Sequence, residues 1–343
     1  MRHSITLLAL VGCSDYELYK KEAADIFYQL EASDVDILLV VDNSCSMAPY
    51  QQELASNFDN FLTFFIEGNV NYQIGVITTS ARDDFYIAPG CEQDAARLEN
   101  SGNLVDGQII TPDTPDAGDI FNDIVRVGTC GDGAEMGLEA ARLALDYAST
   151  GSANQGFLRE DAFLSLIFVS DEQDGSPDPV NDYINDFRAV KAQGSSRADM
   201  NASALVVNDI NECSQQQVNS GANEGSRYID VAEQSAGLIG NICGDDFESI
   251  VTELSLNSSR LTDTFYLSAL PEPSSLVVGL TIAGGGAVEQ PCTEGWTYTL
   301  LDVDGIEKPA IVFDRSNLPP PQTKVTVKYD YGLGDPTGFC EEE

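Results

Sequence analysis

Three oxygen-bearing side chains, Asp42, Ser44 and Ser46, occupy alternate positions of one short segment. The residues before it, 37–41, form an unbroken apolar run rich in β-branched side chains, which is typical of a strand buried on both faces of a parallel sheet. An amphipathic helical pattern follows. On such a strand-to-helix turn the three oxygens are presented toward one point, outside the carboxyl end of a strand, where open α/β sheets bind ligands. Because carboxylate and hydroxyl oxygens are hard ligands, this pattern predicts binding of Mg²⁺, Ca²⁺ or Mn²⁺.

The Asp-x-Ser-x-Ser spacing of residues 42–46 resembles the metal-ion-dependent adhesion site (MIDAS) of von Willebrand factor A (VWA) domains. In that family the Asp and both Ser contact a divalent cation, and two later loops add a Thr and an Asp. Both loops have matches here in the same order, because Thr129 opens a helical pattern and Asp171 follows the apolar run at 163–169. The resemblance therefore implies a metal site made of Asp42, Ser44, Ser46, Thr129 and Asp171.

The apolar runs predict the elements that position these side chains. We expect amphipathic helices between the strands, one of them over Tyr228 to Ile239. The expected strands lie at 37–41, 72–78, 163–169, 204–207 and 264–267. Strands that alternate with helices predict an α/β fold class, a doubly wound, mostly parallel sheet with helices on both faces. The VWA resemblance implies the same architecture.

The sequence pattern changes at Pro271. Gly and Pro turns separate short apolar runs, which predicts a small all-β module. These runs lie at 276–282, 296–301, 310–313 and 324–329. We therefore expect a VWA domain at 34–268 and a β-rich C-terminal domain at 271–343.

The N-terminus has the features of a bacterial lipoprotein signal. A basic start is followed by a short apolar run, and Leu10-Val-Gly-Cys13 resembles a lipobox. This resemblance implies that residues 1–12 are removed, that Cys13 carries the lipid, and that the polar stretch at 13–33 is a tether. Ser14 does not resemble an inner-membrane retention signal, so we expect the protein in the bacterial cell envelope at the outer membrane or cell surface. The membrane is contacted only through the lipid anchor, because we find no other segment apolar enough to cross a bilayer.

Export would permit disulfides among the seven cysteines that follow Cys13. Because seven is odd, at least one of them stays free or pairs outside the chain. Cys213–Cys243 and Cys292–Cys340 are plausible local pairs within their own regions.

Cys45 and Cys130 both lie on loops that the VWA resemblance places beside the metal, which favours a bridge between them. A Cys91–Cys130 pair is the alternative. Zinc binding through these thiols is disfavoured, since no Cys-x-x-Cys pair occurs. The single histidine is His3, so neither a Ser-His-Asp apparatus nor a zinc site with histidine ligands has a histidine in the body of the chain.

The chain has a formal net charge of −39. Nucleic acids and anionic lipid headgroups are disfavoured as partners, because their phosphates would be repelled. Two carboxylates around a doubly charged ion leave little surplus negative charge, so an acidic group of a partner could complete the coordination shell. An acidic protein could then recognise an acidic partner, because the bound ion would contact both.

Three functions fit these observations. The leading hypothesis is a cell-envelope lipoprotein that binds a protein or glycan partner through its cation. An alternative is a structural envelope protein in which the ion only stabilises three loops. The third is a metal-dependent hydrolase with Asp42 as nucleophile, but Ser44 stands where an aspartyl-phosphate enzyme usually has a second acid, and the site loops contain no Lys or Arg. We therefore expect a binding protein and not an enzyme.

Overall fold

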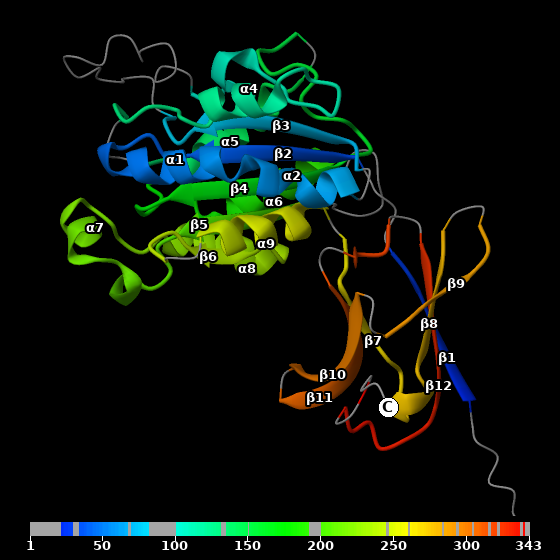
Figure 1. The fold of residues 1–343 in the computed structure, drawn as a ribbon. Helices are drawn as coiled ribbons and strands as arrows, with labels where there is room; N and C mark the ends of the chain where they lie inside the picture. Colours follow the sequence, from blue (N-terminus) through cyan, green and yellow to red (C-terminus); the bar gives the residue numbers. More distant parts are fainter. Residues whose placement is uncertain are drawn as a thin grey trace, which may run out of the picture. The chain divides into compact units, whose positions relative to one another are not determined.

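The computed structural model describes residues 22–29, 34–67, 70–81, 101–131, 135–149, 151–191, 200–244, 247–259, 261–282, 285–292, 295–303, 305–314, 317–320, 323–336 and 339. The chain divides into two compact units. The first, which we call the α/β unit, comprises Tyr28–Thr262 and Leu318–Thr323. The second, the β unit, comprises Asp263–Asn317, Lys324–Glu343 and the N-terminal residues up to Phe27. Figure 1 labels the elements of both.

A five-stranded parallel sheet is the centre of the α/β unit, with the strand order β3-β2-β4-β5-β6. Its strands are β2 (Val35–Val41), β3 (Tyr72–Thr78), β4 (Phe163–Ser170), β5 (Met200–Val206) and β6 (Ile239–Asn241). Every residue of β2 and β4 is buried, as expected of central parallel strands that are covered on both faces. The predicted α/β fold class is confirmed by this topology.

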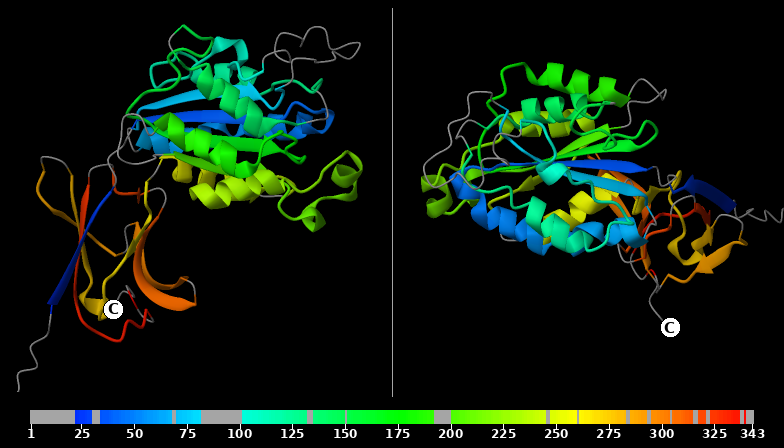
Figure 2. Two further views of the ribbon diagram at one scale, coloured as in Figure 1. Left: turned by 180° about the vertical axis from the view of Figure 1, so that it is seen from behind. Right: turned by 90° about the horizontal axis from the view of Figure 1, so that it is seen from above.

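Helices cover both faces of the sheet (Figure 2). Leu38 and Val40 of β2 face one hydrophobic cluster, and Ile37 and Leu39 face the other, because successive side chains of a strand point to opposite faces. The Ile37 side packs against α1 (Ala48–Ser56), α2 (Phe58–Glu67), α4 (Ala117–Ile124) and α9 (Phe247–Ser259). The Leu38 side packs against α5 (Gly137–Asp146), α6 (Val180–Lys191) and α8 (Ser226–Ser235).

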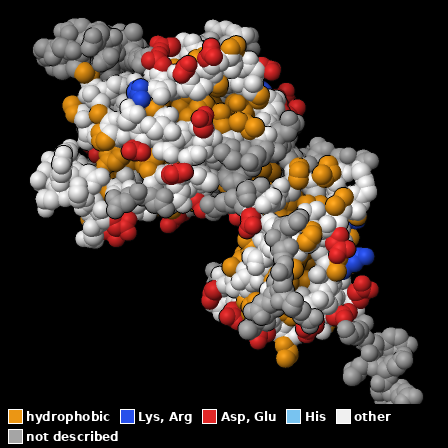
Figure 3. Space-filling model, in the orientation of Figure 1, with side chains coloured by type: hydrophobic (Ala, Val, Ile, Leu, Met, Phe, Trp, Pro, Cys, Tyr) orange, Lys and Arg blue, Asp and Glu red, His pale blue; other side chains and the backbone are white. Residues whose placement is uncertain are grey.

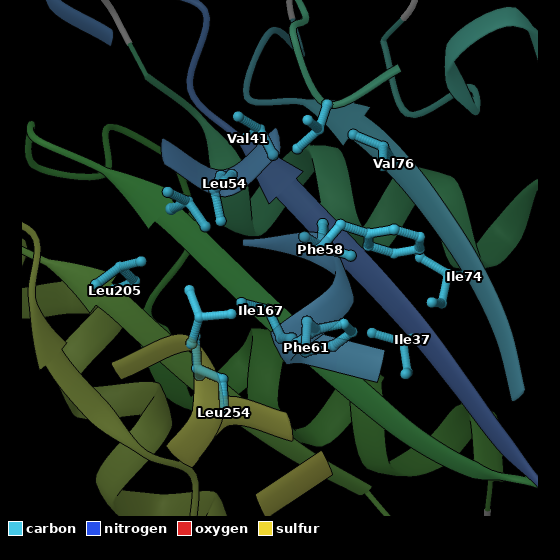
Figure 4. Close-up of a cluster of buried hydrophobic side chains, with 14 of the residues drawn as sticks. Ile37, Val41, Leu54, Phe58, Phe61, Ile74, Val76, Ile167, Leu205 and Leu254 are labelled. Carbon is cyan, nitrogen blue, oxygen red and sulfur yellow. The ribbon is translucent and has the colours of Figure 1, made fainter. Parts of the chain in front are cut away.

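Figure 4 shows side chains of the first of these layers, with Phe61 beside Ile37, Phe58 extending toward Ile74, and Leu254 approaching Ile167. The ring of Phe58 also stacks on that of Phe121, with centroids 3.8 Å apart. This packing fixes α1 and α2 against the sheet, and so fixes the turn that joins β2 to α1. None of the described helices is both long enough and apolar enough to cross a membrane.

The β unit contains two antiparallel arrangements of strands. One sheet has the order β1-β12-β8-β9 and the other the order β10-β11-β7. The strands of the first are β1 (Glu22–Tyr28), β12 (Lys324–Asp330), β8 (Val277–Thr281) and β9 (Val288–Gln290). Those of the second are β10 (Trp296–Val303), β11 (Ile306–Phe313) and β7 (Thr264–Tyr266). The ring of Phe265 lies 5.3 Å from that of Phe27 and 5.7 Å from that of Phe313, so β1 shares a core with β7 and β11.

Three sequence-based expectations about the extent of elements and units are wrong. The strand expected at 264–267 does not join the parallel sheet, because β7 pairs antiparallel with β11, and the C-terminal part of the β unit therefore begins at Asp263 and not after 268. Part of the expected tether at 13–33 is β1, a strand of the β unit. The helix expected to reach Ile239 ends at Ser235, and Ile239 begins the edge strand β6. The expected signal at 1–12 and the lipidated Cys13 lie outside the described residues.

Candidate metal centre

Asp42 lies directly after β2, at the carboxyl edge of the sheet. Its backbone N–H donates to the carbonyl oxygen of Val169 at 2.9 Å, so the ends of β2 and β4 are held together at this point. The Asp42 carboxylate is buried and accepts two hydrogen bonds, from the Ser44 backbone N–H and from the Ser170 hydroxyl, each at 2.6 Å. Burial raises the pKa of Asp42 although both bonds act to lower it. One carboxylate is thus fixed at the start of the site with no freedom to rotate away.

The two serines connect this turn to the loop after β4. The hydroxyl oxygens of Ser44 and Ser46 lie 3.0 Å apart, and the Ser46 hydroxyl donates to the Asp171 carboxylate at 2.9 Å. Asp171 is itself buried. Ser46 and Asp171 are separated by 125 residues in sequence, so only the parallel pairing of β2 with β4 brings them together. The structure thus brings Ser44, Ser46 and Asp171 into contact, and their role as metal ligands stays a prediction.

The loop that contains Thr129 is bound to the first turn through its backbone. Gly131 donates its N–H to the Asn43 carbonyl oxygen at 2.7 Å, and a β-carbon on Gly131 would lie only 2.3 Å from the Asn43 side-chain oxygen. No larger residue fits there. Thr129 itself is half-buried, and no hydrogen bond joins its hydroxyl to Asp42, Ser44 or Ser46 among the described residues. The structure brings the Thr129 loop to the site, and a direct role for the Thr129 hydroxyl stays a prediction.

Gln51 is a positioning residue that the sequence did not point to. Its buried side-chain amide donates to the Asp42 carbonyl oxygen at 2.9 Å and to the Gly128 carbonyl oxygen at 2.8 Å. One amide group on α1 therefore holds the first and second loops of the site together. An amphipathic pattern gives no signal for such a residue, because a buried polar side chain on the apolar side of a helix interrupts the pattern.

Glu135 is a further acid of the site that sequence reasoning missed. It is buried in the loop before α5 and accepts a hydrogen bond from the Thr79 hydroxyl. Its carboxyl lies within hydrogen-bonding reach of Asp42, and burial together with the Asp42 charge raises the pKa of Glu135 well above its usual range. The other carboxyl oxygen, Oε1, is buried and has no hydrogen-bond donor. The only feature of the sequence that could have indicated a role for Glu135 is its position in the same glycine-rich segment as Thr129.

The acids around the site destabilise one another's charged forms. Burial, then repulsion from Asp42, raises the pKa of Asp171 to about 6. Glu172 is partly buried, and burial followed by repulsion from Asp42 and Asp171 raises its pKa to about 7. A group of acids with this much mutual repulsion and hard oxygen donors beside it fits a doubly charged cation.

The donor set determines how such an ion could be held. The described residues contain no group of three or more Asp, Glu, Cys or His side chains placed to hold a metal by themselves. Hydroxyl oxygens must therefore contribute, as Ser44 and Ser46 can beside Asp42 and Asp171. This mixture of carboxylate and hydroxyl oxygens suits Mg²⁺, Ca²⁺ or Mn²⁺ and lacks the sulfur and nitrogen ligands that zinc prefers.

Asp174, two residues beyond Glu172, has a different role. Its carboxylate forms an ion pair with Arg227 at 2.9 Å and accepts hydrogen bonds from the Leu138 backbone N–H and the Ser176 hydroxyl. Both carboxylate oxygens of Asp174 are therefore occupied by these partners. Asp174 therefore braces the loop after β4 against α5 and α8, and it is not a free ligand.

A segment between β5 and α8, residues 208–224, forms a wall beside the Asp171 loop. Asn223 donates its backbone N–H to the Asp171 carbonyl oxygen at 2.9 Å, and its side chain accepts from the Gln173 N–H at 3.0 Å. The wall is also held to α1 by a 2.7 Å bond from Gln217 to the Tyr50 hydroxyl. A sequence pattern without apolar periodicity gave no hint of this role.

The disulfides differ in part from expectation. Cys213 and Cys243 are bonded, as predicted, and this bridge ties the 208–224 wall to the end of β6. The expected Cys45–Cys130 bridge is wrong, because Cys45 is a free, exposed thiol. Cys45 begins the short 3-10 turn Cys45–Met47, and its side chain is exposed while that of Ser44 is buried and that of Ser46 is partly buried.

The remaining pairings stay predictions. Cys130 and Cys292 are each disulfide-bonded. Cys91 and Cys340 lie outside the described residues, so the expected Cys91–Cys130 and Cys292–Cys340 pairs are not tested.

No known family model and no curated protein matches the chain. Among solved structures it is similar to proximal thread matrix protein 1 (PTMP1) from the mussel byssus, with 13% identity and a TM-score of 0.37 over 69% of this chain and 48% of that one. Another PTMP1 structure, described with a zinc-occupied MIDAS motif, has 15% identity, the same TM-score and the same coverage. The pilus adhesin SpaC from Lactobacillus rhamnosus GG has 12% identity and a TM-score of 0.40 over 90% of this chain and 41% of that one. This chain spans less than half the length of each of these proteins.

Proposed function

We propose that the α/β unit binds a divalent cation at Asp42, Ser44, Ser46 and Asp171, and that the ion holds a protein or glycan partner carrying an acidic group. The protein would do so as a lipoprotein of the bacterial envelope, anchored through Cys13. The observation that carries the proposal is the continuous contact from Ser44 through Ser46 to Asp171 beside the buried Asp42. It places oxygen donors from two distant loops at one edge of the sheet.

The residues of the site have separate tasks in this proposal. Asp42 and Asp171 supply negative charge, and the hydroxyls of Ser44 and Ser46 supply neutral oxygens. Gln51 and Gly131 fix the loop that carries Thr129, so that its hydroxyl can approach the same point. A bound divalent cation would supply the positive charge and the open coordination position that a partner's carboxylate needs.

The surface charge gives the cation a particular importance. Acidic side chains are spread over the visible face of the described residues in Figure 3, and basic ones are few. An acidic partner would be repelled by such a surface at distances within the screening length, about 8 Å at physiological ionic strength. A local divalent charge makes one point attractive in an otherwise repelling field, which confines the partner to that point.

A structural role for the ion is the alternative. It is favoured by the number of direct bonds that already join the three loops, among them those of Gln51 to Asp42 and Gly128 and that of Gly131 to Asn43. In that case the ion adds thermal stability without holding a partner.

The test combines cation binding with partner capture. Native protein is titrated with Ca²⁺, Mg²⁺ and Mn²⁺ by calorimetry, and is then immobilised to capture components of an envelope extract with and without chelator. Asp42→Ala should abolish both cation binding and capture, whereas Asp230→Ala, which removes an exposed acid on α8, should change neither.

Either of two results would contradict the proposal. Native protein that binds none of the three cations has no such site. Capture that persists in chelator and in Asp42→Ala, while chelator lowers the melting temperature of the native protein, supports the structural role instead.

A further inference from the structure

We propose that one end of the β unit contacts a bilayer of zwitterionic phospholipid and inserts the side chains of Leu270, Tyr331 and Leu333 into it. We call these three side chains the apolar tip. The inference rests on the lipoprotein part of the proposed function, to which it adds a direct contact between protein and membrane. It does not involve the proposed cation site.

The apolar tip is formed by two segments that are paired through their backbones. Pro271 and Tyr331 form an antiparallel bridge. Gly332 donates its N–H to the Leu270 carbonyl oxygen at 3.0 Å. The exposed fraction is 42% for Leu270, 46% for Tyr331 and 91% for Leu333, which is the most exposed large hydrophobic side chain among the described residues. Because exposed hydrophobic side chains that gather in one place mark interaction surfaces, the tip is a candidate contact.

The apolar tip lies close to the start of β1. Tyr329, near the end of β12, donates its hydroxyl to the Asp25 carboxylate at 2.7 Å. Ser268, just before the other segment of the tip, donates to the same carboxylate through its N–H at 2.8 Å and its hydroxyl at 2.7 Å. Asp25 belongs to β1, which begins at Glu22. Figure 1 shows the start of β1, the end of β12 and the segment before β8 at the same end of the β unit.

The proposed lipid on Cys13 would hold this end of the β unit near a membrane. Only residues 14–21 lie between Cys13 and Glu22. An extended chain spans at most about 3.3–3.6 Å per residue, so β1 begins within about 30 Å of the lipid-bearing residue. A bilayer is therefore the large apolar phase that is always within reach of the tip once the chain is anchored.

The charges around the tip determine which surface it fits. Glu272 and Asp335 are exposed next to the tip, and the chain has a net charge of −39. An anionic bilayer would repel these acids, and a second copy of the chain would bring the same acids together. Zwitterionic headgroups have no net charge and offer an ammonium group to each acid. Tyr331 also suits such a boundary, because tyrosine combines an apolar ring with a polar hydroxyl and is enriched at membrane interfaces.

The experiment measures sedimentation of the protein with vesicles of phosphatidylcholine and phosphatidylethanolamine. The chain is produced from Ser14 onward, which keeps every described residue and removes the apolar signal and the lipid-bearing cysteine. We expect this protein to sediment with the vesicles, and less so when anionic phosphatidylglycerol is added. Leu333→Ser should lower the partition coefficient by roughly tenfold, as loss of a buried leucine side chain predicts. Its melting temperature should stay native, because the side chain is exposed in the folded protein.

Val288→Ser is the matched control for Leu333→Ser. Val288 is 60% exposed in the edge strand β9 of the same unit, where it pairs with Leu280 and not with a residue of the tip. We expect Val288→Ser to partition into vesicles as the native protein does. Equal losses in Val288→Ser and Leu333→Ser would overturn the inference, because any exposed hydrophobic side chain would then suffice.

A second measurement reports the position of the tip itself. Tyr331→Trp places an indole at the tip, and the single native tryptophan, Trp296, is buried and adds a constant background. Phospholipids brominated in their acyl chains should quench the fluorescence of Tyr331→Trp more strongly than that of Val288→Trp. Equal quenching of the two variants would show that the tip does not enter the bilayer.

The outcomes separate this inference from the proposed function. If the protein does not sediment with vesicles, or if Leu333→Ser sediments as the native protein does, the inference is wrong. A dimer in analytical ultracentrifugation that Leu333→Ser dissociates would assign the tip to a second copy and also overturn it. If the protein binds vesicles through Leu333 but binds none of the three cations, the inference stands and the proposed cation site fails.

Discussion

Ser46 donates its hydroxyl hydrogen to the carboxylate of Asp171 over 2.9 Å, although the two residues belong to different loops of the sheet edge. Each loop follows a strand that is buried along its whole length, β2 before Ser46 and β4 before Asp171. The contact therefore depends on strand register, in which Val41 pairs with Val169. A site built in this way is positioned by the most rigid part of the fold.

Removal of the Ser46 hydroxyl should weaken cation binding without unfolding the protein. Ser46→Ala deletes one oxygen donor and the bond to Asp171, and we expect a loss of affinity of roughly tenfold or more, since a hydrogen bond to a charged group contributes about 1.5–3 kcal/mol. Cys45→Ala changes the neighbouring exposed residue and is the matched control. Calorimetric titration measures both variants. Equal affinities for the two would show that Ser46 is not a ligand.

Gln51→Leu should lower both stability and cation affinity. The change leaves two buried carbonyl oxygens, those of Asp42 and Gly128, without their donor, which costs about 1–3 kcal/mol in the free energy of unfolding. Urea denaturation measures this cost. Gln52→Leu alters the exposed neighbour and should stay within about 0.5 kcal/mol of the native protein.

The effect on affinity distinguishes a positioning role from a purely structural one. Under conditions in which Gln51→Leu is fully folded, it should still bind the cation more weakly than Gln52→Leu does. A folded Gln51→Leu protein with native cation affinity would show that the two loops keep their positions without the hydrogen bonds of Gln51.

The metal-free protein should become less stable as pH rises from about 4 to 7. The pKa of Asp171 is raised from 3.8 to about 6 and that of Glu172 from 4.5 to about 7 in the folded state, so in this range the folded protein binds more protons than the unfolded chain. Stability contributed by these protons is present at low pH and is lost as they dissociate. For the buried Asp171 the loss is at most ~3 kcal/mol, at 1.36 kcal/mol for each pKa unit.

The measurement compares melting temperatures in chelator between pH 5 and pH 8 for native protein and Asp171→Asn. The amide variant does not titrate, so its profile should be flatter than that of the native protein. A native profile no steeper than that of Asp171→Asn would exclude this contribution. Addition of a divalent cation should reverse the trend, because metal binding favours the deprotonated carboxylates.

Asp36→Ala should be severely destabilising but should not affect the cation site. Asp36 is fully buried at the opposite end of β2, where it pairs with Arg159 at 2.7 Å and with the buried Lys191 at 3.4 Å. Removal of the acid leaves the buried Lys191 without its carboxylate and Arg159 with only the more exposed Asp34, at 3.1 Å, and the cost is about 3–5 kcal/mol. Thermal unfolding measures the loss, and cation affinity at low temperature should match the native value. A weakened affinity would show that the two ends of the sheet are coupled.

The strands that carry the site could be predicted because their signal is local. A parallel strand covered on both faces needs a mostly apolar run: 37–41 inside β2 is unbroken, and 72–78 and 163–169, in β3 and β4, are largely apolar. The edge strands could not be placed in the same way. The run at 264–267 has the composition of a strand, but nothing in it specifies that β7 pairs with β11 in the other unit.

The buried polar residues of the site were missed for a related reason. In sequence Glu135 resembles the many acids of a chain with a net charge of −39, and Gln51 resembles an exposed helical residue. Their burial follows from close approach of distant loops, such as that of Gly175 to Glu135 and of Gly128 to Gln51. Hydrophobic periodicity indicates which side of a helix or strand is buried, but it does not identify the residues that pack against that side.

The pairing of β1 with β12 has a consequence for how the chain is made. These neighbouring strands come from opposite ends of the sequence, and the whole of Tyr28–Thr262 lies between them. During synthesis the first strand leaves the ribosome long before its neighbour, while every strand of the parallel sheet is complete by Asn241. The α/β unit can thus mature first, and β1 stays without its neighbour until β12 has been synthesised.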